Sequence, residues 1–523
     1  MRVQLINPPV YLNVHALTAL RPSMPLGLAY IAAALRRDGH RISVVDAVAA
    51  APDRVTQDGP VYRLGLSPEE IVARLDGSAD CFAITNMWSF SWPLVRAIIQ
   101  QVKARYPRIP IVAGGEHFTG LPEHSLRQAP IDCIVLGEGE ETAVEVFRAV
   151  AAGAPLADIR GVAFLRDGQF VRTPNRDRTR AVDDLPWPAW DLFDLEVYNQ
   201  HDLVTGLHAG MTVPILATRG CPYQCTYCSS PNMWTTRWYA RDPKDVADEI
   251  EQNLKVHGAT NFPFQDLTAI LKRDWVIAFS SEIINRKLNI TWQLPAGTRS
   301  EIVDDEVARL LYASGCRSVN FAPESGSERT RKHMKKMLTD EKLFRAVNAA
   351  VKNGLNVGCF LVLGYPTDDA SDMKATTKMI RRLARAGVDD VSAGFFFPLP
   401  STEIYYELEK QGKVKMSDDF LKLPIYVHNK FMTSDRVYTP HLTAKQMTRW
   451  KYWIVANFYL TSFFTRPLRV FKIFGNFLRG RETSKMESFL QETRRKFSLR
   501  FGKKQSAEAK PEPKRPTAAP TGA

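Results

Sequence analysis

The string RGCPYQCTYCSS, residues 219–230, places thiols at Cys221, Cys225 and Cys228, directly after a predicted strand over residues 215–218. Thiolates are ligands for zinc and for iron–sulfur clusters. A structural zinc ion normally has four protein ligands, and no histidine or fourth cysteine lies close by in the sequence. Three ligands on a four-iron cluster leave one iron open for catalysis. Free cysteines usually lie in the core, so a chance grouping in a polar loop is the weaker interpretation.

The same string resembles the Cys-x-x-x-Cys-x-x-Cys signature of the radical S-adenosylmethionine (SAM) superfamily, in which an aromatic residue, here Tyr227, commonly precedes the last cysteine. The resemblance implies a 4Fe–4S cluster whose open iron binds the amino and carboxylate groups of SAM. It also implies that one-electron reduction cleaves SAM to a 5′-deoxyadenosyl radical, which abstracts a hydrogen atom from the substrate. In such enzymes the cofactor carries the chemistry, while the protein positions it and excludes water.

A repeated strand–helix pattern around this string predicts a partial (βα)6 barrel of the TIM type, because a closed barrel uses eight such units. We expect its active site at the carboxyl ends of the strands. The predicted strands cover residues 215–218, 261–264, 291–294, 318–321, 357–362 and 390–396.

Short motifs at the ends of these strands resemble those of radical SAM barrels, in the same order. APESGS (322–327) ends the fourth strand, GYP (364–366) the fifth and PLPST (398–402) the sixth; the last resembles Pro-x-Pro-Gly-Thr with Ser401 in place of glycine. Each motif alone is weak, because glycine and proline end strands everywhere. A solvated or capping carboxylate is the competing interpretation of Glu324. The resemblance implies that SAM is bound by Tyr227, Asp266, Arg299, Glu324 and Ser325.

Residues 1–151 alternate short apolar runs with helical patterns, which predicts a doubly wound, Rossmann-like parallel sheet. Ligands of such sheets bind beyond the carboxyl ends of the strands. The predicted strands cover residues 3–6, 42–45, 81–84, 109–113 and 131–136, and the predicted helices cover 26–37, 92–106 and 141–151.

These strand ends resemble the cobalamin (B12)-binding domain that precedes many radical SAM barrels. The matching strings are NPP (7–9), MPLGLAY (24–30), VVD (44–46), GGEH (114–117) and GEGEET (137–142). Glycine at a strand end lets the backbone approach a bulky planar ligand, and N–H groups at a helix start can bind a phosphate. Cobalamin offers both groups. The resemblance implies cobalamin contacts from Asn7, Pro8, Trp88, Gly114, Gly115, Glu116, Gly137, Glu138, Gly139 and Glu140.

The first domain departs from the usual cobalamin pattern after its first strand. Many such domains carry Asp-x-His-x-x-Gly there, with the histidine on cobalt, but this chain has NPP (7–9). DGH (38–40) matches only in part and lies at a predicted helix end, and His117 is interpreted as a loop histidine near the ligand. The sequence therefore predicts cobalt without a histidine on its lower face. A sheet that binds a nucleotide, or no ligand, is the alternative.

Composition favours a globular protein in a reducing compartment. The chain has 523 residues, 45% of them hydrophobic and 24% charged. Its seven cysteines are an odd number, which argues against a disulfide framework. The first residues lack the apolar core of a signal peptide, and the longest apolar run, 452–464, is shorter than the roughly 20 residues that cross a bilayer. We expect a cytoplasmic protein with domains at 1–151 (cobalamin-binding), 152–210 (connector), 211–436 (radical SAM barrel), 437–504 (basic aromatic helices) and 505–523 (unfolded tail).

The net charge of +13 is concentrated late in the chain and favours anionic partners. No aromatic RNA-binding motif accompanies it, so we expect no nucleic acid partner. Residues 450–501 combine aromatic side chains with Arg and Lys, as in an amphipathic helix with a basic face. One hypothesis is peripheral docking on the cytoplasmic face of a membrane. The other, which we favour, is a helix packed on the barrel with its basic face in solvent.

Two such domains, each with its ligand at the strand carboxyl ends, resemble the class B radical SAM methyltransferases. The resemblance implies methylation of an unactivated carbon of a small-molecule substrate, with a methyl group delivered from cobalamin and electrons from a donor such as a flavodoxin or ferredoxin. Phenylalanines at the barrel mouth, 395–397, suggest a hydrophobic substrate, although such residues are more often core. A non-methylating oxidative cyclisation or ring rearrangement is the first alternative. A non-catalytic cobalamin or redox sensor is the second.

Overall fold

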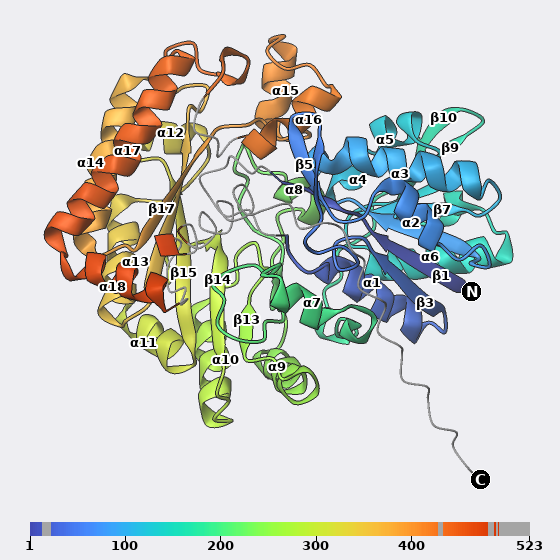
Figure 1. Cartoon of the computed structure of the whole chain (residues 1–523), viewed down its shortest axis with the longest axis horizontal. Coiled ribbons are helices and arrows are strands. Elements are labelled where there is room, and N and C mark those ends of the chain that lie inside the picture. Colours follow the sequence, from blue (N-terminus) through green and yellow to red (C-terminus); the bar gives the residue numbers. More distant parts are fainter. Residues whose placement is uncertain (13–21, 427–431, 480–485, 488–489, 491–523) are drawn as a thin grey trace.

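The computed structural model of the chain describes residues 1–12, 22–426, 432–479, 486–487 and 490. Two βα domains lie side by side, the N-terminal one on the right of Figure 1 and the barrel domain on the left. The last described helices lie along the outer side of the barrel domain. The predicted fold class, a doubly wound domain followed by a partial barrel and a helical C-terminal region, is confirmed.

The N-terminal sheet has seven strands. They are β1 (Arg2–Asn7), β3 (Arg41–Asp46), β6 (Cys81–Thr85), β7 (Ile111–Gly114), β8 (Cys133–Val135), β9 (Val162–Arg166) and β10 (Gln169–Arg172). Their order across the sheet is β10-β9-β8-β7-β6-β1-β3, and the five strands from β8 to β3 are parallel. The direction of winding reverses between β1 and β6. Ligands of doubly wound sheets bind at this reversal point, beyond the carboxyl ends of the strands.

Helices cover both faces of this sheet (Figure 1). They are α1 (Leu26–Arg37), α2 (Pro68–Arg74), α3 (Trp92–Arg105), α4 (Glu116–Gly120), α5 (Pro122–Gln128) and α6 (Glu140–Ala152). α1 has the predicted bounds, and α3 and α6 lie within one residue of theirs. A separate apolar core lies on each face, with Phe147 in one and Phe82 in the other. Both cores continue into the barrel domain, so apolar packing joins the two domains.

Two features of the first domain differ from the sequence-based expectation. The hairpin of β9 and β10, assigned to the connector, joins the sheet because β9 pairs antiparallel with β8. The sheet therefore continues past residue 151. A small antiparallel sheet of β2 (Val10–Leu12), β4 (Val55–Asp58) and β5 (Val61–Leu64) is missing from the prediction. Its strands are short, and β4 is polar and largely exposed, so no apolar alternation marks it.

The barrel sheet consists of five parallel strands in sequence order. They are β13 (Asn261–Pro263), β14 (Thr291–Thr298), β15 (Cys316–Glu324), β16 (Asn356–Leu363) and β17 (Asp390–Phe395). All five were predicted. The predicted first strand, 215–218, is instead reduced to isolated parallel bridges from Thr212 and Ile215 to the β13 region.

The ladder of this first strand stops because a side chain takes its backbone donors. The carboxylate of Asp266 accepts hydrogen bonds from the backbone N–H groups of Ala217 and Thr218. Thr218 then begins the short strand β11 (Thr218–Arg219), which pairs antiparallel with β12 (Tyr239–Ala240). The cysteine string therefore leaves the barrel through β11.

Helices connect the barrel strands and begin at side-chain caps. Asp242, Asp304, Thr339 and Asp369 each accept a backbone N–H in the first turn of the helix that follows them. Such caps satisfy donors that have no partner within the helix. The helices of this domain and of the connector are α7 (Leu195–Gln200), α8 (Ser230–Trp234), α9 (Pro243–His257), α10 (Arg273–Asn285), α11 (Asp305–Ala313), α12 (Glu328–His333), α13 (Asp340–Lys352), α14 (Ala370–Ala386), α15 (Glu403–Lys410) and α16 (Asp418–Lys422).

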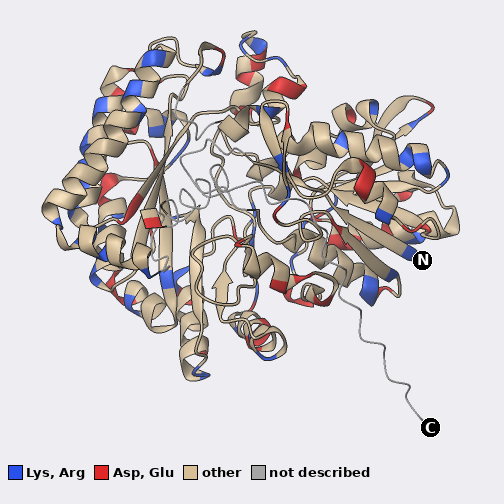
Figure 2. Cartoon of the chain, viewed as in Figure 1, with Lys and Arg blue, Asp and Glu red and all other residues tan. Residues whose placement is uncertain are grey.

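The C-terminal region contributes α17 (Ala444–Thr465) and α18 (Leu468–Leu478). α17 packs along α14, where Arg381 Nε donates to Asn457 Oδ1 at 2.8 Å. Figure 2 shows Lys and Arg on this outer side of the barrel domain, and neither α17 nor α18 contains Asp or Glu. Within the described ranges, none of the helices has the length and hydrophobicity that crossing a membrane requires. The predicted tail, 505–523, lies outside the described residues.

Gly326, in the APESGS motif after β15, lies against α14. A Cβ atom there would meet Thr376 Cα and approach Ala375 O to 2.6 Å. We expect Gly326→Ala to lower the free energy of unfolding by about 1–3 kcal/mol, the usual effect of overpacking. Gly27→Ala in α1 is the control, because a Cβ there meets no atom within 4 Å and alanine favours the helix by ~0.5–1 kcal/mol. Urea unfolding of both variants measures the difference, and equal stabilities would contradict this packing.

Candidate functional site

The three cysteines of the RGCPYQCTYCSS string lie between β11 and α8. We call residues 220–229 the cluster loop. The seven cysteines, all within the described residues, form no disulfide. Cys221, Cys225 and Cys228 are partly exposed, whereas the other four are buried in strands. Buried single thiols are typical of core packing, so only the cluster loop has the accessible thiols that an iron–sulfur cluster needs.

Strand-end motifs fix the cluster loop at its centre, through Thr226. Its backbone N–H donates to Met334 O at 3.2 Å, and its hydroxyl bonds to Tyr365 Oη at 2.8 Å. Its carbonyl accepts from Ile404 N at 3.0 Å. Tyr365 belongs to the GYP motif after β16, and Ile404 follows the PLPST motif after β17. Thr226 was absent from the predicted site, because its only signal in the sequence is its position between two of the cysteines.

The chemistry of the three thiols fits an iron cluster. Cys228 N donates to Cys225 O at 3.1 Å, which folds the loop into a turn. Burial raises the pKa of the Cys221 thiol, and it raises the pKa of Cys228 to about 12. Metal binding is what deprotonates such thiols at neutral pH. In the described part of the chain, no group of three or more His, Cys, Asp or Glu side chains could hold a metal ion together; in a 4Fe–4S cluster each thiolate binds a different iron atom.

Two predicted SAM contacts lie beside the cluster loop and contact each other. Tyr227 Oη donates to Glu324 Oε1 at 2.9 Å, and Lys336 Nζ donates to the same oxygen at 3.1 Å. Burial and then the charge of Glu324 raise the pKa of Tyr227, so it remains a donor. Glu324 has φ +64°, a left-handed conformation that residues with a side chain adopt rarely. Such strain concentrates at functional sites, and here it occurs at a residue whose carboxylate bonds to the cluster loop.

Arg299 and Ser325, two further predicted SAM contacts, are engaged with the protein. The Arg299 guanidinium lies 3.7 Å from the centre of the Tyr223 ring in the cluster loop, and it pairs with Glu301. Ser325 Oγ accepts from Ser327 N at 3.1 Å, where the APESGS motif turns. Both residues therefore shape the loop and strand end, and their direct contact with SAM stays a prediction.

Asp266, the remaining predicted SAM contact, is buried beneath the start of the cluster loop. It accepts from the Thr218 hydroxyl at 2.6 Å and from Ala217 N at 3.2 Å. Burial raises its pKa to about 6. These contacts hold the segment that leads into the loop, so the structure shows a positioning role for this carboxylate.

Several buried polar atoms around these residues have no hydrogen-bond partner in the described part of the chain, and four of them come from residues outside the predicted SAM contacts. They are Gln265 Nε2, Thr298 Oγ1, Ser300 Oγ and Ser230 Oγ. Gln265, Thr298 and Ser300 lie at the carboxyl ends of β13 and β14, and Ser230 follows the cluster loop. Buried polar groups are rarely left unpaired, so these atoms fit a polar ligand such as SAM. These residues are absent from the predicted SAM contacts, because single Ser, Thr and Gln residues at strand ends carry no distinct pattern.

The predicted cobalamin contacts lie at the carboxyl ends of β1, β6, β7 and β8, around the reversal point of the sheet. Asn7 Nδ2 donates to Asp46 Oδ1 at 2.8 Å and to Tyr198 Oη at 3.2 Å. Pro8 is buried and Trp88 is 55% exposed. Tyr198, from α7 in the connector, is absent from the sequence-based site.

The GGEH motif brings the first domain to the cluster loop. Gly115 has φ +115°, and a Cβ atom there would approach Asn86 O to 2.7 Å, so the neighbouring strand end requires glycine. Gly114 has no such close neighbour. Glu116, at the start of α4, accepts from the hydroxyl of Ser229, the residue after Cys228. Burial raises the pKa of Glu116.

The GEGEET motif makes a buried ion network with the residue before the cluster loop. Arg219 Nη2 donates to Glu140 Oε1 at 2.6 Å, and Arg219 Nη1 lies 3.4 Å from Glu138 Oε1. Arg178 Nε, from the connector, donates to Glu138 Oε2 at 2.5 Å. Burial alone would raise the pKa of Glu140, but the charge and hydrogen bond of Arg219 outweigh it and lower that pKa. Both carboxylates thus bind arginine; cobalamin contact from these residues, and from Gly137 and Gly139, stays a prediction.

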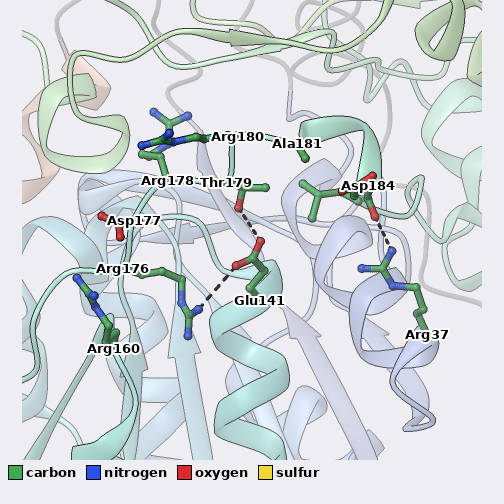
Figure 3. Close-up of a pocket in the computed structure, with 11 residues that line it drawn as sticks. Arg37, Glu141, Arg160, Arg176, Asp177, Arg178, Thr179, Arg180, Ala181 and Asp184 are labelled. Carbon is green, nitrogen blue, oxygen red and sulfur yellow. Dashed lines mark hydrogen bonds and ion pairs between the residues drawn. The ribbon is translucent and has the colours of Figure 1, made fainter.

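Arg178 also lines a pocket of about 390 Å³ between the connector and the first domain (Figure 3). Its walls are mostly charged. Glu141 of α6 pairs with Arg176 and accepts from the Thr179 hydroxyl at 3.1 Å. None of the residues predicted to bind the cluster, SAM or cobalamin is among the described residues that line this pocket. The pocket lies at the interface between the connector and the first domain.

The cluster loop generates a direct prediction about iron. Cys228→Ala removes one of the three thiolates, so we expect anaerobically reconstituted protein to lose most of the about four iron atoms per chain that a 4Fe–4S cluster carries. Cys316→Ala, at a buried cysteine of β15, is the matched control and should keep its iron despite lower stability. Iron and sulfide analysis checks both. Equal iron in the two variants would rule out this loop as the cluster site.

The ion network predicts a large effect of one arginine on stability. Arg219→Met leaves buried carboxylates without their cation, and we expect it to lower the free energy of unfolding by about 3–5 kcal/mol. Adding Glu140→Gln should restore part of the loss, because it removes the stranded charge. Arg36→Met, at the exposed Arg36–Asp191 pair, should change stability by less than about 1 kcal/mol.

The same network predicts a dependence on pH. The pKa of Glu140 is lower in the folded chain, so the pair stabilises the fold above the ordinary carboxylate pKa and loses this effect as pH falls through the folded value. Urea unfolding across that acidic range should show a shallower pH dependence for Arg219→Met than for the unaltered chain. Parallel curves would contradict the assignment.

Comparison with known proteins identifies both domains. The model of the B12 binding domain matches residues 13–147, and that of the radical SAM superfamily matches residues 215–380. The chain is 26% identical over 470 residues to an uncharacterized methyltransferase of Pyrococcus horikoshii, covering 89% of this chain and 93% of that protein. It is 26% identical over 458 residues to the cytidylyl-2-hydroxyethylphosphonate methyltransferase of Streptomyces wedmorensis, with 81% and 84% covered. It is 27% identical over 423 residues to the anaerobic magnesium-protoporphyrin IX monomethyl ester cyclase of Rubrivivax gelatinosus, with 79% and 71% covered.

Solved structures share the fold. The radical SAM methyltransferase TsrM from Kitasatospora setae, with cobalamin and a [4Fe–4S] cluster bound, has a TM-score of 0.63 at 19% identity, over 88% of this chain and 89% of that one. The cobalamin-dependent SAM radical enzyme OxsB has a TM-score of 0.61 at 14% identity, over 80% and 56%. The predicted cofactors, a 4Fe–4S cluster, SAM and cobalamin, agree with both domain matches. The chain is therefore a radical SAM enzyme whose barrel follows an N-terminal B12-binding domain.

Proposed function

We propose that the chain is a cobalamin-dependent radical SAM methyltransferase that methylates an unactivated carbon of a small molecule. The observation that carries the proposal is the contact between the two strand-end sites. Glu116 bonds to Ser229, and Arg219 binds Glu138 and Glu140, so loops of the B12-binding domain pack directly on the cluster loop. Radical methyl transfer needs the substrate near both cofactors, and this arrangement supports such a site.

The residues of the chain have separate tasks in this proposal. When bound, the cluster and SAM supply the hydrogen-abstracting radical, and cobalamin carries the methyl group. Cys221, Cys225 and Cys228 hold the cluster, and Thr226 fixes their loop. Glu324 binds the amino group of SAM in this proposal, which its contact with Tyr227 of the cluster loop supports. The unpartnered polar atoms of Gln265, Thr298 and Ser300 are available to its carboxylate and ribose hydroxyls.

The structure bears on the prediction of a hydrophobic substrate. The phenylalanines at 395–397 are buried in the two cores, and Phe396 packs edge-on against Tyr365 with ring centres 5.2 Å apart. They therefore give no support to a hydrophobic substrate. We further propose a one-electron donor such as a flavodoxin or ferredoxin. We also propose a reducing, cytoplasmic setting, because none of the cysteines in the described residues forms a disulfide.

SAM carrying a labelled methyl group tests the reaction. We expect reduced, anaerobically reconstituted protein with cobalamin and its substrate to form both 5′-deoxyadenosine and S-adenosylhomocysteine, and the label to enter the product. Substrate is sought by incubation with fractionated cell extract. Cys228→Ala should form no 5′-deoxyadenosine above background. Formation of 5′-deoxyadenosine without S-adenosylhomocysteine or labelled product, in the presence of cobalamin, would exclude methyl transfer.

Similarity to the cyclase of Rubrivivax gelatinosus favours a second candidate, an oxidative cyclisation or ring rearrangement on the same architecture. In that reaction the labelled methyl group stays out of the product, and the product mass shows loss or rearrangement of hydrogen. A sensor without catalysis is the remaining alternative, and it requires that no 5′-deoxyadenosine forms under reducing conditions.

A further inference from the structure

The surface formed by the last turns of α17 and by α18 is apolar over an unusual extent. Six large side chains on it are exposed, from 61% for Phe474 to 89% for Phe464. Scattered apolar residues are ordinary on a protein surface, but a contiguous apolar patch marks an interaction site. Spacings of three or four residues place Leu460 and Phe464 on one side of α17, and Leu468, Phe471, Phe474 and Leu478 on one side of α18; the non-helical Arg466 (φ −138°) separates the two helices. We call this set the apolar stripe: Leu460, Phe464, Leu468, Phe471, Phe474 and Leu478.

The apolar stripe is not the side of these helices that packs on the barrel. Ile454 and Phe458 of α17 and Ile473 of α18 are buried on another side. Arg469 Nη1 donates to Val388 O at 2.9 Å, which fixes α18 beside the barrel. Both helices are therefore already packed, and no residue in the described ranges covers the stripe.

The segment of the chain that carries the stripe holds charges of a single sign. Between residues 437 and 481 there are eight Lys or Arg residues and no Asp or Glu. Lys472 and Arg479 each follow a stripe residue by one position, about 100° around the helix, so they flank it. Both are exposed. Lys472 also interacts electrostatically with the buried carboxyl of Asp389. Figure 2 shows this basic side of the domain.

We propose that the apolar stripe docks the enzyme on the surface of a bilayer that contains anionic lipids. Exposed aromatic and leucine side chains with flanking cations are the combination by which a helix lies in a membrane interface. The apolar side chains enter the boundary between headgroups and acyl chains, and Lys472 and Arg479 bind lipid phosphates. A patch for a neutral protein partner would not need a segment so free of acidic residues.

The place of the stripe in the fold sets the orientation of the docked enzyme. α17 begins at the carboxyl end of the barrel strands, where Met447 lies against Gly364, and ends at their amino end, where Arg466 donates to Ala386 O. The stripe therefore lies at the end of the barrel away from the cluster loop. Docking through it leaves the catalytic site facing the aqueous phase, so this surface anchors the enzyme and does not deliver a substrate from within the bilayer.

Vesicle co-sedimentation tests the proposal with full-length, cluster-loaded protein. We expect binding to vesicles of phosphatidylcholine and phosphatidylglycerol in equal parts, and much weaker binding to phosphatidylcholine alone. Phe471→Glu should reduce binding at least about ten-fold, because it places a charge in the apolar stripe. Val256→Glu is the matched control, since Val256 on α9 is also exposed (59%) but lies outside the stripe, and it should bind like the unaltered chain.

Lys472→Gln with Arg479→Gln should weaken binding by about five-fold per cation removed, and added salt should mimic this effect.

Three outcomes would overturn the proposal. The first is the absence of binding by the full chain while a chain ending at Arg479 binds, which would show that the following residues cover the stripe. The second is equal loss of binding in Phe471→Glu and Val256→Glu. The third is a dimer that forms without lipid and that Phe471→Glu converts to a monomer.

Iron content confirms that each variant is folded, and SAM cleavage in solution should be unchanged in Phe471→Glu. Vesicle binding does not depend on the reaction catalysed, so the proposal stands or falls apart from the proposed function.

Discussion

Arg219 is buried in the barrel domain and finds its carboxylates in the other domain, at Glu138 and Glu140. A buried guanidinium without a partner is strongly unfavourable, so this residue can occupy its place only when the two domains are docked. It is also the residue that precedes the cluster loop. The position of the first cysteine, Cys221, therefore depends on an ion pair that the B12-binding domain supplies.

The rest of the cluster loop is held from within the barrel. Thr226 bonds to segments that follow β15, β16 and β17, and Tyr227 bonds to Glu324 at the end of β15. Asp266 holds the residues before the loop, and Glu116 bonds to the residue after its last cysteine. Few of these contacts involve the cysteines themselves. The surrounding residues thus arrange the loop in advance, and such preorganisation is what a site for a reactive cofactor requires.

Much of the fold could be predicted, because strands and helices of both domains leave local apolar patterns. The cysteines and the strand-end motifs were also recognisable, since they are compact strings. Thr226, Tyr198 and Arg178 were not, because their roles come from partners far away in the sequence. Glu138 and Glu140 were selected because they belong to a motif. The motif does not reveal the residue that they bind, and only the fold shows that this partner is Arg219. Ser401 adopts φ +64°, which explains why the related motif has glycine at this position.

The hairpin of β9 and β10 has a consequence for dividing the chain. β8 is hydrogen-bonded to β7 on one side and to β9 on the other. A fragment cut at residue 151 would leave the β9 side of β8 as an open row of unpaired backbone donors and acceptors, and such edges recruit strands from other molecules. An isolated first domain that stays monomeric in solution therefore has to extend through Arg172.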